Sequence, residues 1–187
     1  ALLGRELLVE AHSASGRWPE AAETLRQAAT ETEDAALKVS LLYRAGRIYF
    51  ARLGDEDAAE AVYRSLLDEV PEFLPAAMDL KDMYLSRGDW DAYGLLLQQE
   101  GESASEEDEA VALHLGAGQA YERAGRAQDA IGQYRAGLGL RPGHPVANSV
   151  LRRVYRSTAD HSALAESFRS ELAASGDARQ TDALRAQ

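Results

Sequence analysis

Four histidines are the residues of this chain best suited to metal binding or acid–base chemistry, and their spacing favours neither. His12, His114, His144 and His161 are scattered along the sequence, and no two of them stand at the helical spacing that metal ligands use. We therefore interpret them as packing or surface residues. Because the chain has no cysteine, thiolate metal sites and disulfides are excluded.

Two other segments look like ligand sites only in part. The Gly-Ala-Gly segment at 116–118 lacks the third glycine and the lysine of a phosphate-binding loop, and it follows no predicted strand. The acidic run at 106–109 could bind a cation, but carboxylates also suit the first turn of a helix, and Ser105 with Asp108 predicts a capping box there. No catalytic triad or carboxylate pair can be argued from spacing. The sequence therefore predicts no enzyme activity, no cofactor and no metal.

The composition indicates a folded, helical and acidic protein. The 187-residue chain is 45% apolar and 27% charged, and Ala, Leu, Arg and Glu are abundant while β-branched residues are sparse. Its net charge of −11 opposes binding to phosphate backbones, so we expect no nucleic-acid partner. No apolar run approaches the ~20 residues of a membrane span, so we expect no membrane insertion. The preference for Arg over Lys is typical of GC-rich bacterial genomes, and the compartment is left open.

A repeat of helix, tight turn and helix organises the chain. Glycines 16, 54, 88 and 125 fall between apolar helical segments at spacings of 38, 34 and 37 residues, and Ala159-Asp160 follows 34 residues later. Two sets of landmarks keep the same step. A few residues before each turn is one member of the set His12, Tyr49, Tyr84, Tyr121 and Tyr155. Nine residues after each turn glycine, or after Ala159, is one member of the set Leu25, Tyr63, Leu97, Tyr134 and Phe168.

Local chemistry explains these landmarks. Glycine ends a helix in the left-handed conformation at low steric cost. Asp55 and Asp89 can then cap the next helix through their side-chain oxygens, and Pro19 suits the start of a helix. Each unit is therefore predicted to be a two-helix hairpin.

The sequence resembles the tetratricopeptide repeat family. The similarity is strongest over 111–144, where Ala120-Tyr121, Gly125, Ala130-Ile131, Tyr134, Leu138 and Pro142 match the family's signature. The second hairpin also matches, with one extra residue near Leu53-Gly54. The third and fifth hairpins place Tyr93, Arg152 and Leu164 in slots for small residues, so related helical-hairpin repeats remain an alternative for the outer units.

The resemblance implies an all-α fold, an α-α superhelix of about five helical hairpins. We expect one repeat domain over 1–187, with hairpins near 2–35, 38–73, 74–104, 105–144 and 145–176 and a terminal or capping helix at 177–187. In this family the first helices of the hairpins line a concave groove that holds a partner's peptide or helix. Helical phase then assigns the groove to Tyr43, Arg44, Arg47, Phe50, Met78, Asp79, Asp82, Leu85, Leu115, Gln119, Glu122, Arg123, Arg153 and Arg156.

These side chains predict a protein or peptide partner with charges of both signs and an apolar anchor near Tyr43, Phe50 or Met78. The alternative is that they form ordinary solvated helix faces. The leading function is a protein-interaction scaffold within a larger assembly. Two alternatives remain: a self-assembly module that forms a homo-oligomer, and a regulatory or docking segment of a multidomain enzyme.

Overall fold

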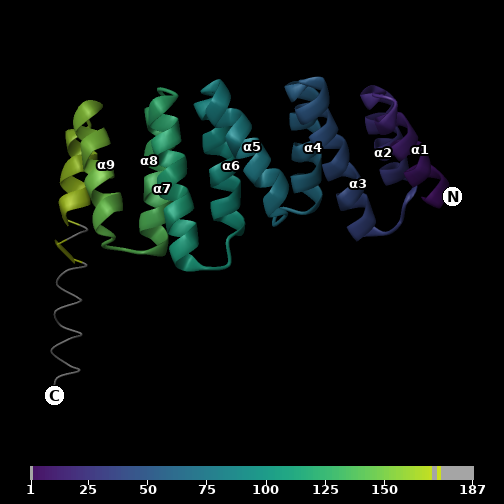
Figure 1. Ribbon diagram of the computed structural model, residues 1–187. Coiled ribbons are helices and arrows are strands. Elements are labelled where there is room, and N and C mark those ends of the chain that lie inside the picture. The colour runs from purple at the N-terminus through teal and green to yellow at the C-terminus, as the bar shows by residue number, and fades with distance from the viewer. Residues whose placement is uncertain (1, 170–171, 174–187) are drawn as a thin grey trace, which may run out of the picture. The chain divides into compact units, whose positions relative to one another are not determined.

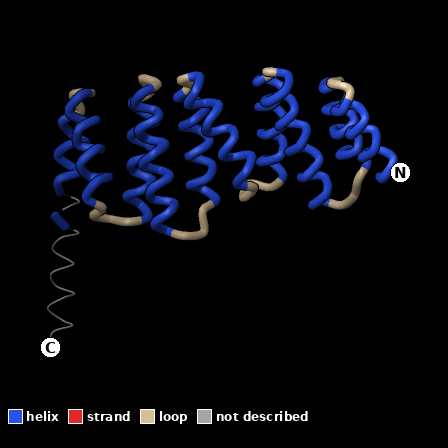
Figure 2. Tube along the Cα trace, viewed as in Figure 1, coloured by secondary structure: helices blue, strands red, loops and turns tan. Residues whose placement is uncertain are grey.

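A computed structural model describes residues 2–169 and 172–173, and these residues contain helices and no strand (Figures 1 and 2). The helices, in chain order, are α1 Leu2–Ala14, α2 Trp18–Glu31, α3 Ala35–Ile48, the π-helix η1 Tyr49–Leu53, α4 Glu56–Glu69, α5 Leu74–Arg87, α6 Trp90–Ser103, α7 Glu107–Arg123, α8 Ala127–Leu140 and α9 Pro145–Ser157. Residues 161–169 are also helical. The predicted all-α fold class is confirmed. The terminal helix predicted at 177–187 lies outside the described residues.

The chain divides after Ser86 into two compact units, which we call unit 1 and unit 2. Unit 1 contains α1 to α4 and nearly all of α5, and unit 2 contains α6 to α9. Within unit 1, helices that follow one another from α1 to α4 pack side by side, and the same holds from α6 to α9 in unit 2 (Figure 1). The predicted grouping of all the helices into five hairpins of one domain stays a prediction.

The predicted turns form as expected. Gly16, Gly54, Gly88 and Gly125 have φ between 64° and 78°, and Ala159 takes the same left-handed conformation at φ 55°. After three of these turns, an aspartate caps the next helix by accepting a backbone N–H three residues ahead. These aspartates are Asp55, Asp89 and Asp160, with N–H···O distances of 3.0, 3.0 and 2.9 Å.

The capping box predicted at Ser105 is wrong. Helix α7 begins at Glu107, its N-cap is Glu106, and no side chain caps it. The first turn is instead acidic, which suits the positive end of the helix dipole, and Arg141 pairs with Glu107 and with Asp108. The acidic run therefore has a structural role.

The extra residue predicted near Gly54 is absorbed by η1. In the turn after α7, the N–H of Arg126 donates to the carbonyl of Tyr121, five residues earlier. In the turn after η1, the N–H of Asp55 donates to the carbonyl of Tyr49, six residues earlier, at 3.0 Å. A π-helix has hydrogen bonds between residues five apart, whereas an α-helix has them between residues four apart, so η1 takes up the additional residue before the turn.

A tyrosine from the second helix packs into a glycine gap on the first helix at two equivalent places. A Cβ on Gly46 would lie 2.3 Å from Cε1 of Tyr63, and a Cβ on Gly118 would lie 2.3 Å from Cε1 of Tyr134. Both tyrosines are fully buried. Glycine is therefore required at these two positions because the ring occupies the space of a side chain.

Candidate functional site

The face of unit 1 that carries the predicted binding residues is formed by α3, η1 and α5. Arg44 on α3 is already engaged, because its guanidinium donates two hydrogen bonds to the carboxylate of Glu6, at 2.7 and 3.1 Å. These hydrogen bonds, more than the charge itself, lower the pKa of Glu6. Arg44 and Glu6 therefore form a bidentate ion pair between α3 and α1.

Tyr43 and Arg47, one helical turn apart on α3, have different surroundings. The Tyr43 ring packs against Tyr63 at 5.8 Å and edge-on against Phe73 at 5.4 Å, between ring centroids, so it is half-buried. Arg47 is exposed. A hydrogen bond to the Tyr43 hydroxyl, followed by the attraction of Asp79, raises the pKa of Arg47.

Asp79 joins α5 to this cluster. One of its carboxylate oxygens is shielded from solvent, as is the hydroxyl of Tyr63. Burial, followed by the charge of Asp79, raises the pKa of Tyr63. Asp79 on α5 therefore influences both Tyr63 on α4 and Arg47 on α3.

Large apolar side chains are exposed on η1 and α5. Phe50 on η1 is 38% exposed, and Met78 and Leu85 on α5 are 62% and 42% exposed. Asp82, between the last two, is also exposed. Unit 1 therefore presents exposed apolar side chains together with the exposed cation Arg47 and the exposed carboxylate Asp82.

In unit 2, half of the six predicted residues have polar or cation–π partners within the unit. Glu122 accepts hydrogen bonds from the hydroxyl of Tyr134 and from Arg153, the latter at 2.7 Å. Burial, followed by the hydrogen bond to Glu122, raises the pKa of Tyr134. The guanidinium of Arg123 lies 4.3 Å from the centre of the Trp90 ring, a cation–π contact.

The remaining predicted residues of unit 2 divide between surface and core. Gln119 and Arg156 are exposed. Leu115 packs against the core cluster that contains Tyr121, Tyr134 and further residues of α8 and α9. Leu115 is therefore partly buried against the core and is also a member of the predicted set.

Two of the four histidines, His114 and His144, have structural roles. His114 is buried, and its Nδ1 lies 2.8 Å from Oε1 of Gln133, which is also buried. His144 caps α9 by accepting the N–H of Ala147 at 3.2 Å. Among residues 2–169 and 172–173, no three His, Asp or Glu side chains are grouped as a metal site would require. The helices in that part of the chain are too short or too polar to cross a bilayer.

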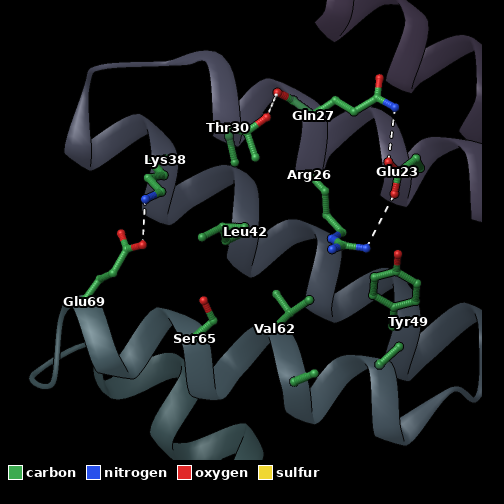
Figure 3. A pocket seen from close by; sticks show the side chains of 13 residues that line it. Glu23, Arg26, Gln27, Thr30, Lys38, Leu42, Tyr49, Val62, Ser65 and Glu69 are labelled. Atoms are coloured by element: carbon green, nitrogen blue, oxygen red, sulfur yellow. Dashed lines mark hydrogen bonds and ion pairs between the residues drawn. The ribbon is translucent and has the colours of Figure 1, made fainter.

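A cleft on another side of unit 1 was not anticipated from the sequence. It lies between α2 and α4, over α3, and has a volume of about 550 Å³ (Figure 3). The available signal was the extra residue near Gly54, because η1 begins at Tyr49, which lines this cleft.

Comparison with known proteins now assigns the family. The model of the tetratricopeptide repeat matches residues 7–72 and 99–145, more than half of the chain. The chain belongs to the tetratricopeptide repeat family. Members of this family are typically non-catalytic scaffolds for protein–protein interaction, so membership supports that broad role here. No curated protein sequence matches the chain significantly.

Solved structures of MamA resemble this tetratricopeptide repeat chain. MamA AMB-1 is 20% identical over 90% of this chain and 88% of its own, with a TM-score of 0.45. MamA MSR-1 is 20% identical over 94% and 97%, with a TM-score of 0.43. MamA from Desulfovibrio magneticus RS-1, from residue 41 to its end, is 19% identical over 90% and 91%, with a TM-score of 0.42.

Proposed function

We propose that this chain is a scaffold that binds a segment of another protein along the exposed faces of α3, η1 and α5, as part of a larger assembly. The observation that carries the proposal is the exposure of Phe50, Met78 and Leu85 beside Arg47 and Asp82. Large apolar side chains grouped with charged ones are typical of a surface that binds a partner.

The partner's chemistry follows from which charges are already paired. Arg44 is occupied by Glu6, whereas Arg47 is exposed and can donate two hydrogen bonds to a carboxylate. Asp82 is exposed and can accept from a partner's Lys or Arg. We therefore expect a segment with an apolar anchor over Met78 and charges of both signs beside it.

The predicted residues of unit 2 that are exposed are polar. Gln119 on α7 and Arg156 on α9 are exposed. The nearby Glu122 and Arg153 are paired with each other. A partner that contacts Gln119 and Arg156 would therefore meet hydrogen-bonding groups at these two positions.

Site-specific crosslinking tests this proposal. A photo-crosslinking amino acid replaces Met78 in one variant and the exposed Ala11 of α1 in a matched control, and both are irradiated in native lysate. We expect a protein that is crosslinked at position 78 and not at position 11. The same products at both positions would contradict the proposed surface.

Charge reversal provides a second readout once the partner has been captured. Arg47→Glu should weaken its binding at least about tenfold and leave the far-UV circular dichroism unchanged, because Arg47 is exposed. Undiminished binding would contradict the role of Arg47. Light scattering separates the alternative of self-assembly, which predicts a mass that rises with concentration.

A further inference from the structure

The cleft between α2 and α4 in unit 1, here called the α2–α4 trough, is a groove lined by residues of four helical segments. Its walls are formed by α2 and α4 and its floor by α3 and η1 (Figure 3). The lining residues are Glu23, Arg26, Gln27, Ala29, Thr30, Lys38, Leu42, Tyr49, Ala58, Ala61, Val62, Ser65 and Glu69. Since a helix rises about 1.5 Å per residue, the wall from Ala58 to Glu69 is roughly 16 Å long.

Three other junctions of the chain each carry a hydrogen bond at one matching position. At those junctions, the residue ten positions after the turn reaches the hydroxyl of the tyrosine that precedes the next turn. The pairs are Arg64 with Tyr84 at 2.9 Å, Gln98 with Tyr121 at 3.0 Å and Arg135 with Tyr155 at 2.9 Å.

The equivalent residues at the trough are Arg26 and Tyr49, and they are arranged differently. Arg26 pairs with Glu23 on its own helix, at 3.5 Å, and both Arg26 and Tyr49 line the trough. Tyr49 is also the first residue of η1. The π-helix therefore coincides with the junction where the trough is found.

The trough is apolar in its middle and polar at its ends. Leu42 and Val62 lie in the middle (Figure 3), and the α4 wall also contributes the small residues Ala58 and Ala61. At one end, Lys38 on α3 pairs with Glu69 on α4 at 2.6 Å. A helix is about 10 Å wide, so the volume of about 550 Å³ admits a row of side chains from one helix face rather than a whole helix.

The charge around the trough selects the partner. Helices α2 and α4 together carry eight carboxylates and two arginines. Within the lining of the trough, Glu23 pairs with Arg26 and Glu69 pairs with Lys38. The chain as a whole has a net charge of −11. A partner with basic side chains would therefore be attracted to these walls, and an acidic one would be repelled.

We propose that the α2–α4 trough docks an amphipathic helix of a partner protein, with an aliphatic ridge in the trough and Arg or Lys on both sides of that ridge. Ridges of side chains on one helix fit grooves between others, and the small residues of the α4 wall leave room for aliphatic side chains. None of the residues that line the trough belongs to the set predicted on the exposed faces of α3, η1 and α5. The two binding proposals can therefore be tested independently.

Two synthetic probes test the proposal on the intact chain. The first is a fluorescent helical peptide with leucine at every third or fourth position and Arg and Lys on the flanks. The second has each basic residue replaced by Glu. We expect anisotropy to show binding of the basic peptide and at least about tenfold weaker binding of the acidic one.

A pair of matched variants locates the binding. Ala61→Gln places a longer neutral side chain in the trough, and Ala11→Gln makes the same change on the exposed surface of α1. We expect Ala61→Gln to weaken binding of the basic peptide at least about tenfold, and Ala11→Gln to leave its affinity unchanged. In the unmodified chain, amide NMR shifts should concentrate at Leu42 and Val62.

Other outcomes overturn the proposal. These are equal binding by Ala61→Gln and wild type, preference for the acidic peptide, and no binding of either peptide. Amide shifts confined to α5 would place the peptide on the other surface. A concentration-dependent mass that Ala61→Gln abolishes would show that a second copy of the chain occupies the trough.

Discussion

Replacing Gly118 with alanine should destabilise unit 2, although alanine is the better helix former. In a helix interior the change gains about 1 kcal/mol of propensity. The new Cβ would stand 2.3 Å from Cε1 of Tyr134 and 2.7 Å from its Cδ1 and Cζ. Overpacking of this kind costs about 1–3 kcal/mol, and the upper part of that range applies because the ring is fully buried and its hydroxyl is bonded to Glu122. We expect a net loss of about 1–2 kcal/mol.

Gly132 on α8 provides the matched control. It is exposed, and a Cβ there would meet nothing within 4 Å. Gly132→Ala should therefore stabilise the protein by about 0.5–1 kcal/mol. Urea unfolding followed by Trp90 fluorescence in a Trp18→Phe background reports on unit 2. The reasoning is refuted if Gly118→Ala is as stable as Gly132→Ala.

A double-mutant cycle isolates the contact itself. At the positions equivalent to Gly118 and Tyr134, α1 and α2 carry Val9 and Leu25, so a larger residue is accommodated where the ring is replaced by leucine. In a Tyr134→Leu background, Gly118→Ala should be neutral or stabilising, with a coupling of about 1–3 kcal/mol. A coupling free energy of zero would show that the Tyr134 ring is not the reason why glycine is required at position 118.

Three further perturbations test the caps, the buried tyrosines and the ion pair. Asp89→Ala removes the acceptor for the N–H of Ala92 and should lower stability by about 1 kcal/mol; an unchanged urea midpoint would argue against the cap. Burial raises the pKa of Tyr84 to about 12, above the value of about 10 in an unfolded chain, so its contribution is complete below about pH 10 and is lost as the pH rises toward 12. Tyr84→Phe should flatten that alkaline loss of stability, and a profile identical to wild type would count against it. The hydrogen bonds from Arg44 lower the pKa of Glu6, so their contribution is present at neutral pH and lost as the pH falls through that lowered value; Arg44→Met should reduce this acid sensitivity, and an unaltered acid transition would exclude the pair as its source.

Much of the local architecture follows from short-range chemistry that a sequence displays. The left-handed turns need glycine or a strained substitute, and all four predicted glycines and Ala159 adopt that conformation. The aspartate caps at Asp55 and Asp89 depend on neighbours three residues away. These features are fixed by contacts within one turn of chain, so spacing alone predicts them.

The partners of charged side chains could not be read from spacing. Arg44 and Glu6 are 38 residues apart in sequence and form a bidentate pair. Helical phase assigned Arg44 to the predicted groove, but only packing against α1 brought the carboxylate of Glu6 to it. The same holds for Glu122 and Arg153, which the sequence offered as separate binding residues.

By itself, the sequence determined the helical repeat, its turns, the caps at Asp55 and Asp89 and the family, because each depends on residue types at short, regular intervals. Tertiary structure decided which charges remain available, and it produced the α2–α4 trough. Both depend on distances between helices, which the angle and depth of side-chain packing set and which no local pattern encodes.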